Sequence, residues 1–246
     1  MPTVNSHLVV IGGTSGLGLE IAKAAHASGI KVTIGGRGAE RAAETAKSIG
    51  PNVTGVHIDL GDLPSIRRAL RDGPPIDHLV ITPIMRLSTT VKDFAIAEAE
   101  QLARIKLVGY VETVSAALPR LKPSSSIVLF SGVAKTNPYA GSTMISVVNG
   151  GIVGMTKTMA MELAPIRVNC ISPGLVPDSP IWKRALAQGP NPVVDAMTAK
   201  TPTRRLAMTE DVIQGVFFLL DNKAVNGIDL ELDVRSCDGK PWYASE

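Results

Sequence analysis

Seven short runs of mainly apolar residues are spaced along the chain, each bounded by polar residues, glycine or proline. Runs of this length without strict polar alternation predict strands of a parallel sheet that is covered on both faces. The predicted strands are 7–12, 31–36, 53–58, 78–82, 126–132, 166–172 and 227–233.

Segments with apolar residues three and four positions apart lie between these runs and predict helices. They are 17–29, 63–72, about 92–121, 142–163 and 209–221. Alternation of strand and helix predicts an α/β fold with a doubly wound parallel sheet. The segment 177–202 breaks the alternation, because it holds Pro177, Pro180, Pro190, Pro192 and Pro202 and has weak periodicity. We interpret it as a substrate lid.

Composition supports one domain of this class over residues 1–246. Hydrophobic residues make up 45% of the chain and aromatic residues only 4%, as is typical of helices packed on a buried parallel sheet. The net charge of +3 is small and the basic residues are scattered. Nucleic acid is therefore not an expected partner.

Neither a metal site nor a membrane segment is expected. Cys170 and Cys237 form no CxxC spacing, and the four histidines add no ligand pattern. The chain enters its first strand without a charged leader, and no run of about 18 apolar residues occurs. We expect a cytoplasmic protein without a membrane partner.

Glycines follow the first predicted strand and open the first predicted helix. This strand-to-helix placement lets backbone amides and a helix N-terminus approach a pyrophosphate. The alternative is a tight turn that only packs a helix on the sheet. The residues expected to bind a nucleotide here are Gly12, Thr14, Ser15, Gly16, Leu17 and Gly18.

The spacing Gly12-xxx-Gly16-x-Gly18 resembles the TGxxxGxG fingerprint of the short-chain dehydrogenase/reductase family, with Ile11 where that family usually has threonine. Segments 57–62, 115–132 and 166–174 also resemble this family. The resemblance implies a Rossmann-type fold, a nicotinamide cofactor, a small-molecule substrate and a homodimer or homotetramer. Further cofactor contacts that it implies are Asp59, Leu60, Pro173, Gly174 and Val176.

The end of the second predicted strand bears on the choice of cofactor. An acidic residue there would bind the ribose 2′-hydroxyl of NAD, but the chain has Gly36 followed by Arg37, with Arg41 one helical turn further on. A guanidinium at this place can clamp a 2′-phosphate. The sequence therefore favours NADP(H) over NAD(H), against the alternative of two solvated arginines.

The catalytic tetrad of the resembled family is absent at all four positions. Family members use tyrosine and lysine in a YxxxK motif, a serine 13 residues before the tyrosine, and an asparagine on the preceding helix. The flanking segments set the register of this chain on that pattern. The four positions then hold Ile145 for tyrosine, Asn149 for lysine, Gly132 for serine and Lys106 for asparagine.

Two further segments depart from the family pattern. Residues 79–84 read LVITPI where the family has LVNNAG, and the usual C-terminal DGG is displaced within 231–239. A register that starts the motif at Tyr139 also fails, because it meets Thr143 at the lysine position. General acid–base catalysis supplies roughly 10²- to 10⁴-fold in rate, so ordinary ketone reduction is disfavoured.

Three explanations stay open. In the first, a proton comes from Tyr139, Ser142 or Ser131, or Lys106 reaches the cofactor ribose or Asn149; the alternatives are a loop hydrogen-bonder and a lysine that extends to the surface. In the second, the substrate is a protonated imine or iminium that needs no acid. In the third, the pocket performs a redox-neutral cyclisation, or the chain is a silent nucleotide-binding protein.

Asp178 is the candidate that fits the second explanation. It lies four residues after Gly174, where the family has a threonine that binds the nicotinamide carboxamide, and it would also stabilise positive charge. The alternative is a turn cap before Pro180. Trp182 would then pack over a flat substrate or fill the lid's own core.

A divergent branch of the family that lacks YxxxK resembles this chain in HLVIT, FSGVAKTNP and RVN-ISPG. That branch includes fungal reductases of imine-type intermediates, some of which also guide a cycloaddition. The sequence therefore predicts an NADP(H)-dependent oxidoreductase with an atypical active site. Asn149 is expected to keep a contact with a ribose hydroxyl.

Overall fold

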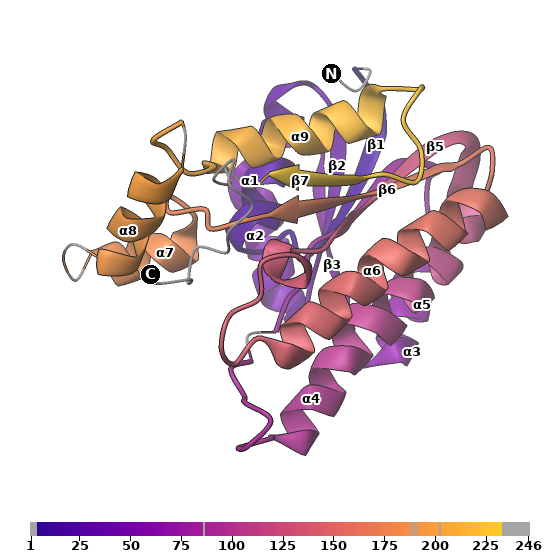
Figure 1. The fold of residues 1–246 in the computed structure, drawn as a ribbon. Coiled ribbons are helices and arrows are strands. Elements are labelled where there is room, and N and C mark those ends of the chain that lie inside the picture. The colour runs from indigo at the N-terminus through magenta and orange to yellow at the C-terminus, as the bar shows by residue number, and fades with distance from the viewer. Residues whose placement is uncertain (1–3, 86, 188, 190, 202, 233–246) are drawn as a thin grey trace.

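The computed structural model describes residues 4–85, 87–187, 189, 191–201 and 203–232. Seven parallel strands form one sheet in the order β3-β2-β1-β4-β5-β6-β7 (Figure 1). The strands are β1 His7–Ile11, β2 Lys31–Gly36, β3 Val53–His57, β4 Ile76–Ile81, β5 Leu121–Phe130, β6 Arg167–Pro173 and β7 Asp229–Leu232. The doubly wound α/β fold and its seven strands are confirmed.

Helices cover both faces of this sheet. On one face α1 (Gly16–Ala27), α2 (Ala39–Ile49) and α9 (Thr209–Asp221) contribute to one apolar core. On the other face α3 (Leu63–Leu70), α5 (Gly109–Ala117) and α6 (Thr143–Glu162) contribute to the second. The central strands are buried on both sides, which is why they are nearly continuous in apolar residues.

Helix α2 was not among the predicted helices. Its buried positions are Ala42 and Ala46, and these small side chains give a weak apolar pattern. The helix nevertheless packs closely on the sheet: a side chain at Gly55 of β3 would overlap the backbone of Ala42. The miss therefore has a physical cause, because close packing here selects small residues.

The predicted lid contains two helices that the sequence pattern did not indicate. They are α7 (Pro180–Leu186) and α8 (Pro192–Lys200), and each begins at a proline. Proline suits the first turn of a helix, since the N–H it lacks would have no partner there. Both helices lie beyond the end of the sheet to which the arrows of β6 and β7 point (Figure 1). Pro190 and Pro202 are outside the described residues.

The predicted helix over about 92–121 is interrupted. It consists of α4 (Ile96–Ala103), a π-helical segment (Arg104–Val108), α5 and a short 3-10 turn (Leu118–Arg120). Such π turns are rare and often occur at functional sites. Lys106 lies in the middle of this one.

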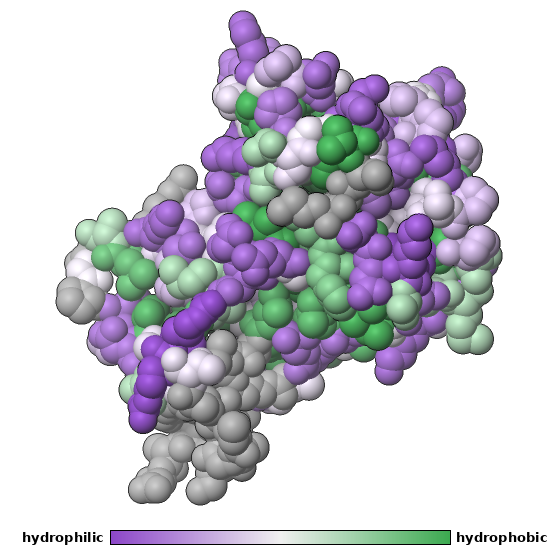
Figure 2. Space-filling view, turned by 90° about the horizontal axis from the view of Figure 1, so that it is seen from above, coloured by the Kyte–Doolittle hydropathy of each residue, from purple (hydrophilic) through white to green (hydrophobic). Residues whose placement is uncertain are grey.

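Two faces of the molecule expose apolar residues. Figure 2 looks down on the side of the molecule that carries α9, and hydrophobic residues gather in the middle of that view. Phe218 of α9 is one of the large hydrophobic side chains that are exposed. On α6, Gly150 and Gly154 face open space, whereas Gly151 packs against Leu107. No described helix is long and apolar enough to cross a membrane.

A buried histidine at the amino end of the sheet joins β4 to β5. His78 Nδ1 lies 2.8 Å from Ser126 Oγ, and Ser126 Oγ donates its proton to the Leu220 carbonyl 3.0 Å away. The histidine must therefore donate through Nδ1. Burial lowers the pKa of His78 to about 4.

We predict that this histidine makes folding stability depend on pH. Because its pKa is about 4 in the folded chain and about 6.5 when unfolded, the neutral form stabilises the fold above pH 6.5. That stability, about 2 to 3 kcal/mol, is lost as pH falls from 6.5 to 4. Urea unfolding at several pH values should show a flatter profile for His78→Asn. The exposed His57 gives the control, His57→Asn, and equal slopes for both variants would contradict the prediction.

Candidate active site

The glycine-rich turn after β1 is shaped for close approach of a ligand. Gly12 and Gly16 have φ of +84° and +59°, which favour glycine. A side chain at Gly18 would lie 2.5 Å from the Gly12 carbonyl oxygen, so the helix packs directly on the turn. Ser15 precedes α1 without a side-chain cap, and the first turn has no acidic residue. The free backbone amides in the first turn of α1 are therefore suited to binding an anion.

Thr82 braces this turn from the neighbouring strand. Its backbone N–H and its hydroxyl both donate to the Ile11 carbonyl, at 3.0 and 2.9 Å. A side chain at Gly12 would overlap the Thr82 hydroxyl. Thr82 of the LVITPI segment therefore has a structural role. It fixes the end of β1 at the switch point of the sheet, where the strand order reverses between β1 and β4.

Steric contact with a neighbouring residue explains why position 36, at the end of β2, is a glycine. A Cβ there would lie 2.5 Å from Cγ2 of Thr14, so Thr14 occupies the space of an acidic side chain. Arg37 follows and is exposed. Arg41 Nη2 approaches the Thr14 carbonyl at 3.5 Å, which places a second guanidinium beside the glycine-rich turn. These two guanidinium groups could hold a 2′-phosphate, and the preference for NADP(H) over NAD(H) remains a prediction.

The other predicted cofactor contacts follow the ends of β3 and β6. Asp59 Oδ1 accepts from the Gly61 N–H at 2.9 Å, while Leu60 is buried against Gly109 of α5. Gly174 N–H donates to the Leu232 carbonyl, which holds the turn after β6. The Val176 side chain is in the core. Contacts of Asp59, Leu60, Pro173, Gly174 and Val176 with a cofactor remain predictions.

Asp178 is held at the start of α9. Its Oδ1 accepts from the N–H of Thr209 at 2.8 Å and from the Thr209 hydroxyl at 3.0 Å. The carboxylate thus joins the beginning of the lid to the first residue of a helix, where the helix dipole favours negative charge. This contact with Thr209 differs from a local turn cap before Pro180. The contact of Asp178 with the nicotinamide carboxamide, and its stabilisation of positive charge, remain predictions.

Ile145 and Asn149 lie one turn apart on the buried side of α6. Ile145 is 7% exposed and packs with Leu102, Ala134 and Val148 in a small apolar cluster. Asn149 is 2% exposed, and its Oδ1 has no hydrogen-bond partner among the described residues. A buried carbonyl oxygen without a partner is costly, so it suits a donor such as a ribose hydroxyl.

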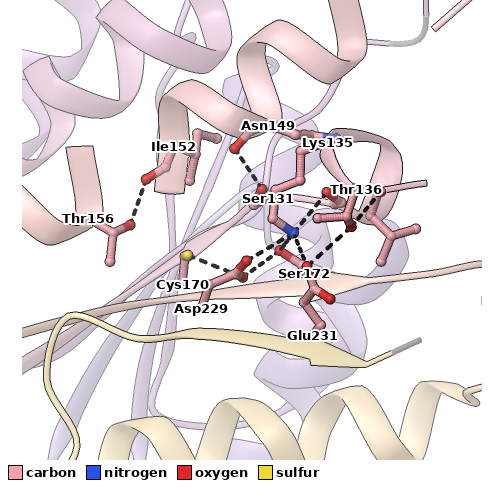
Figure 3. Close-up of polar contacts among 12 residues, drawn as sticks. Ser131, Lys135, Thr136, Asn149, Ile152, Thr156, Cys170, Ser172, Asp229 and Glu231 are labelled. Atoms are coloured by element: carbon pink, nitrogen blue, oxygen red, sulfur yellow. Dashed lines mark hydrogen bonds and ion pairs between the residues drawn. The ribbon is translucent and has the colours of Figure 1, made fainter. Parts of the chain in front are cut away.

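Gly132 and Asn149 fit each other. A Cβ at Gly132 would lie 2.9 Å from Asn149 Nδ2, so the asparagine amide occupies the space of a side chain at that position. Ser131 Oγ donates to the Asn149 carbonyl at 3.0 Å and fixes the same part of α6 (Figure 3). Two of the four positions predicted to depart from the tetrad are therefore coupled sterically.

Lys106 does not extend to the surface as one interpretation expected. It is 1% exposed, and its Nζ donates to the Phe130 carbonyl at 2.5 Å and to Tyr110 Oη at 3.2 Å. Tyr110 Oη in turn donates to the Pro83 carbonyl at 3.0 Å. The amine reaches neither Asn149 nor open space, so direct proton transfer from Lys106 to a substrate is not what this geometry favours.

Tyr139 and Ser142 occupy the loop before α6. Tyr139 is 43% exposed, and its N–H donates to Ser142 Oγ at 2.9 Å. Ser142 is buried and also lies 3.3 Å from Ser146 Oγ. Its hydroxyl therefore fastens the loop. A role in proton transfer for either residue stays a prediction.

An ion cluster around Lys135 anchors the same loop (Figure 3). Lys135 Nζ lies 2.9 Å from Asp229 Oδ2, 2.8 Å from Glu231 Oε1 and 3.0 Å from Ser172 Oγ. Burial and the Asp229 carboxylate raise the pKa of Cys170 to about 12, so this thiol stays protonated. The cluster ties the loop after β5 to β6 and β7.

Sequence reasoning missed Lys135 and Tyr110. A signal for the first was available, because Asp229 and Glu231 alternate with leucines on the last strand and so share one face. A signal for the second was the four-residue spacing from Lys106. Cys237 and most of the displaced DGG region lie outside the described residues, and no described group of three His, Cys, Asp or Glu residues could hold a metal ion.

We predict a measurable coupling between Gly132 and Asn149. Gly132 has φ of 177°, an extended conformation open to any residue, so the cost of Gly132→Ala arises from the contact with Asn149 alone. We expect it to destabilise the fold by about 1 to 3 kcal/mol. In an Asn149→Ala background the cost should fall below about 0.5 kcal/mol. Urea unfolding of the four proteins measures the coupling, and additive effects would contradict it.

A family model described as enoyl-(acyl carrier protein) reductase matches residues 12–234 of the chain. The short-chain dehydrogenase/reductase ATR9 of Stachybotrys chlorohalonatus is 28% identical over 92% of this chain and 95% of its own. Both chains are thus aligned nearly throughout.

Solved structures give the same result. The MalC reductase/Diels-Alderase of Malbranchea aurantiaca matches 95% of this chain and 96% of its own with a TM-score of 0.85 and 23% identity, which bears on the fold alone. A small-chain dehydrogenase in complex with NADPH matches 94% of this chain and 98% of its own with a TM-score of 0.80 and 26% identity. Together with the glycine-rich turn and the seven-stranded sheet, these matches show that the chain belongs to the short-chain dehydrogenase/reductase family of oxidoreductases, which bind nicotinamide cofactors.

Proposed function

We propose that this protein is an NADP(H)-dependent reductase that transfers hydride to a small substrate without a tyrosine acid, and that the substrate is a protonated imine or an iminium. Ile145 carries the proposal. Its side chain is apolar, buried and packed with Leu102 of α4, and in the register predicted from the flanking segments it stands at the position of the family tyrosine. An apolar group at this place can exclude water but cannot give a proton.

The chain's own residues fit the cofactor. The turn over residues 12–18 and the N-terminus of α1 would hold the pyrophosphate, and Arg37 would hold the 2′-phosphate. Asn149 Oδ1, which has no hydrogen-bond partner among the described residues, would accept a hydrogen bond from a ribose hydroxyl. A bound NADPH supplies the hydride. The match to a dehydrogenase that binds NADPH supports this preference.

The electronics of the substrate explain why an acid is dispensable. When hydride adds to the carbon of a C=N⁺ group, the π electron pair moves to nitrogen and leaves a neutral amine. No proton transfers in this step. The site then needs only to orient the acceptor carbon and exclude water. We propose that the lid, α7 and α8, closes the site and that Asp178 stabilises the positive charge.

We also propose a homo-oligomer that uses the open face of α6 around Gly150 and Gly154. A Cβ added at either glycine would meet no other atom within 4 Å, and Met161 on the same helix is largely exposed. Glycines with open space beside them allow another backbone to approach closely.

Arg37 should decide the cofactor preference. Replacing it in Arg37→Asp removes a charge-assisted contact and adds a repulsive carboxylate, so the dissociation constant for NADPH should rise about 10- to 100-fold while that for NADH does not rise. Titration of intrinsic nucleotide fluorescence measures both. Arg71→Asp changes the same charge at an exposed site after α3 and should have little effect. Equal affinities for the two nucleotides in the unsubstituted chain would refute the preference.

A substrate panel tests the absence of an acid. Single-turnover oxidation of bound NADPH should be at least about 100-fold faster with cyclic imines than with matched ketones. Tyr139→Phe should leave imine reduction unchanged. Ketone turnover that this variant abolishes would show that the acid has moved to Tyr139. Binding of NADPH without oxidation by either class would favour a redox-neutral cyclisation, and absence of binding would overturn the proposal.

A further inference from the structure

Lys106 and Tyr110 form a buried pair under the carboxyl ends of β4 and β5. Both side chains are at most 1% exposed, and Nζ of Lys106 lies 4.9 Å from the centroid of the Tyr110 ring. The amine contacts the Phe130 carbonyl at the end of β5, and the tyrosine hydroxyl contacts the Pro83 carbonyl just after β4. Together they connect the two strand ends.

Proline explains why side chains make this connection. Pro83 has no N–H, so the chain after β4 cannot donate a backbone hydrogen bond to β5 at that residue. Two side chains donate instead: Lys106 from the centre of the π-helical segment Arg104–Val108, and Tyr110 from the first turn of α5.

The amine of Lys106 has no charged partner. No ion pair joins it to a carboxylate among the described residues, and the guanidinium of Arg104 in the same segment donates to the Gly61 carbonyl. The ionisable groups that face it are Tyr110 of α5 and the thiol of Cys170 in β6, which are both protonated at neutral pH. Burial without compensation lowers the pKa of Lys106 to about 7.

The cofactor of the proposed function would cross this pair. Strand order runs β1-β4-β5-β6, the glycine-rich turn follows β1, and the segment 174–178 follows β6. A dinucleotide that spans these two places passes over the ends of β4 and β5. Its nicotinamide half therefore lies on the Lys106 side of the site.

We propose that Lys106, held by Tyr110, is a positioning residue that sets the charge beneath the nicotinamide half of the site: its neutral amine admits a cationic ring or a cationic substrate, and its ammonium disfavours them. The proposal rests on the proposed function, because it requires a nicotinamide cofactor. An ammonium near the site would repel an iminium substrate, and the proposal explains how the site avoids this repulsion. The neutral form puts no charge beside the cation.

Comparison of NADP⁺ and NADPH tests this without a substrate, because only the oxidised ring is cationic. The ratio of the dissociation constant of NADP⁺ to that of NADPH should fall about 4- to 10-fold from pH 5.5 to 8.5, because an amine with a pKa of about 7 is almost fully charged at the first pH and almost fully neutral at the second. For a unit charge taken to lie about 10 Å from the ring, this is the effect expected at an effective dielectric of roughly 20 to 40. Titration of the 2′-phosphate affects both nucleotides and cancels in the ratio.

Variants of the pair separate charge from packing. In Lys106→Met the ratio of the NADP⁺ to the NADPH dissociation constant should stay low at every pH. In Lys106→Arg the same ratio should stay high at every pH. Tyr110→Phe removes one acceptor of the ammonium, so the midpoint of the change should move to lower pH. Lys31→Met, at the exposed start of β2, should behave as the unsubstituted chain. Thermal unfolding shows which variants are folded.

Two outcomes would overturn the inference: a ratio in the unsubstituted chain that does not change with pH, or a change that persists in Lys106→Met. Tyr110→Phe tests it independently if the lysine variants fail to fold, and an unmoved midpoint in that variant counts against it. Absence of binding of both nucleotides would refute the proposed function itself, which makes the two failures distinguishable.

Discussion

Parallel alignment of the strands is the constraint on which the rest of this molecule depends. Because β1, β4, β5 and β6 all run in one direction, their carboxyl ends meet at one edge, and the residues that follow each end are brought together there. The two hydrogen bonds from Thr82 to the Ile11 carbonyl fix the switch point between β1 and β4. The glycine-rich turn, the Lys106 pair and the loop before α6 are arranged around that point.

The positions predicted to differ from the family tetrad are occupied by side chains that pack against specific neighbours. Asn149 occupies the space beside Gly132, Ile145 fills a cluster with Leu102, and Lys106 replaces a missing backbone donor at Pro83. Each substitution has a partner that fits it. Restoring one family residue at a time would therefore create an overlap or an empty space, since interiors are close-packed.

Two lysines near the site, one buried and one partly buried, are in opposite electrostatic situations. Lys135 is matched by Asp229 and Glu231, and it anchors the loop after β5 with carboxylates in excess. Lys106 has hydrogen bonds but no carboxylate, so burial favours its neutral form. One ammonium serves to hold the loop in place, and the other is free to change its charge near neutral pH.

The sequence by itself determined the sheet, its strands, the glycine-rich turn and the family, because these depend on local hydrophobic pattern and on fixed spacings near β1. It left α2, α7 and α8 unpredicted, since alanines and prolines give weak patterns. Only the tertiary structure decided that Lys106 is buried with Tyr110, that Asp178 binds Thr209, and that Gly132 accommodates Asn149. These contacts join segments from different elements, and their protonation and packing depend on surroundings that residue spacing along the chain does not specify.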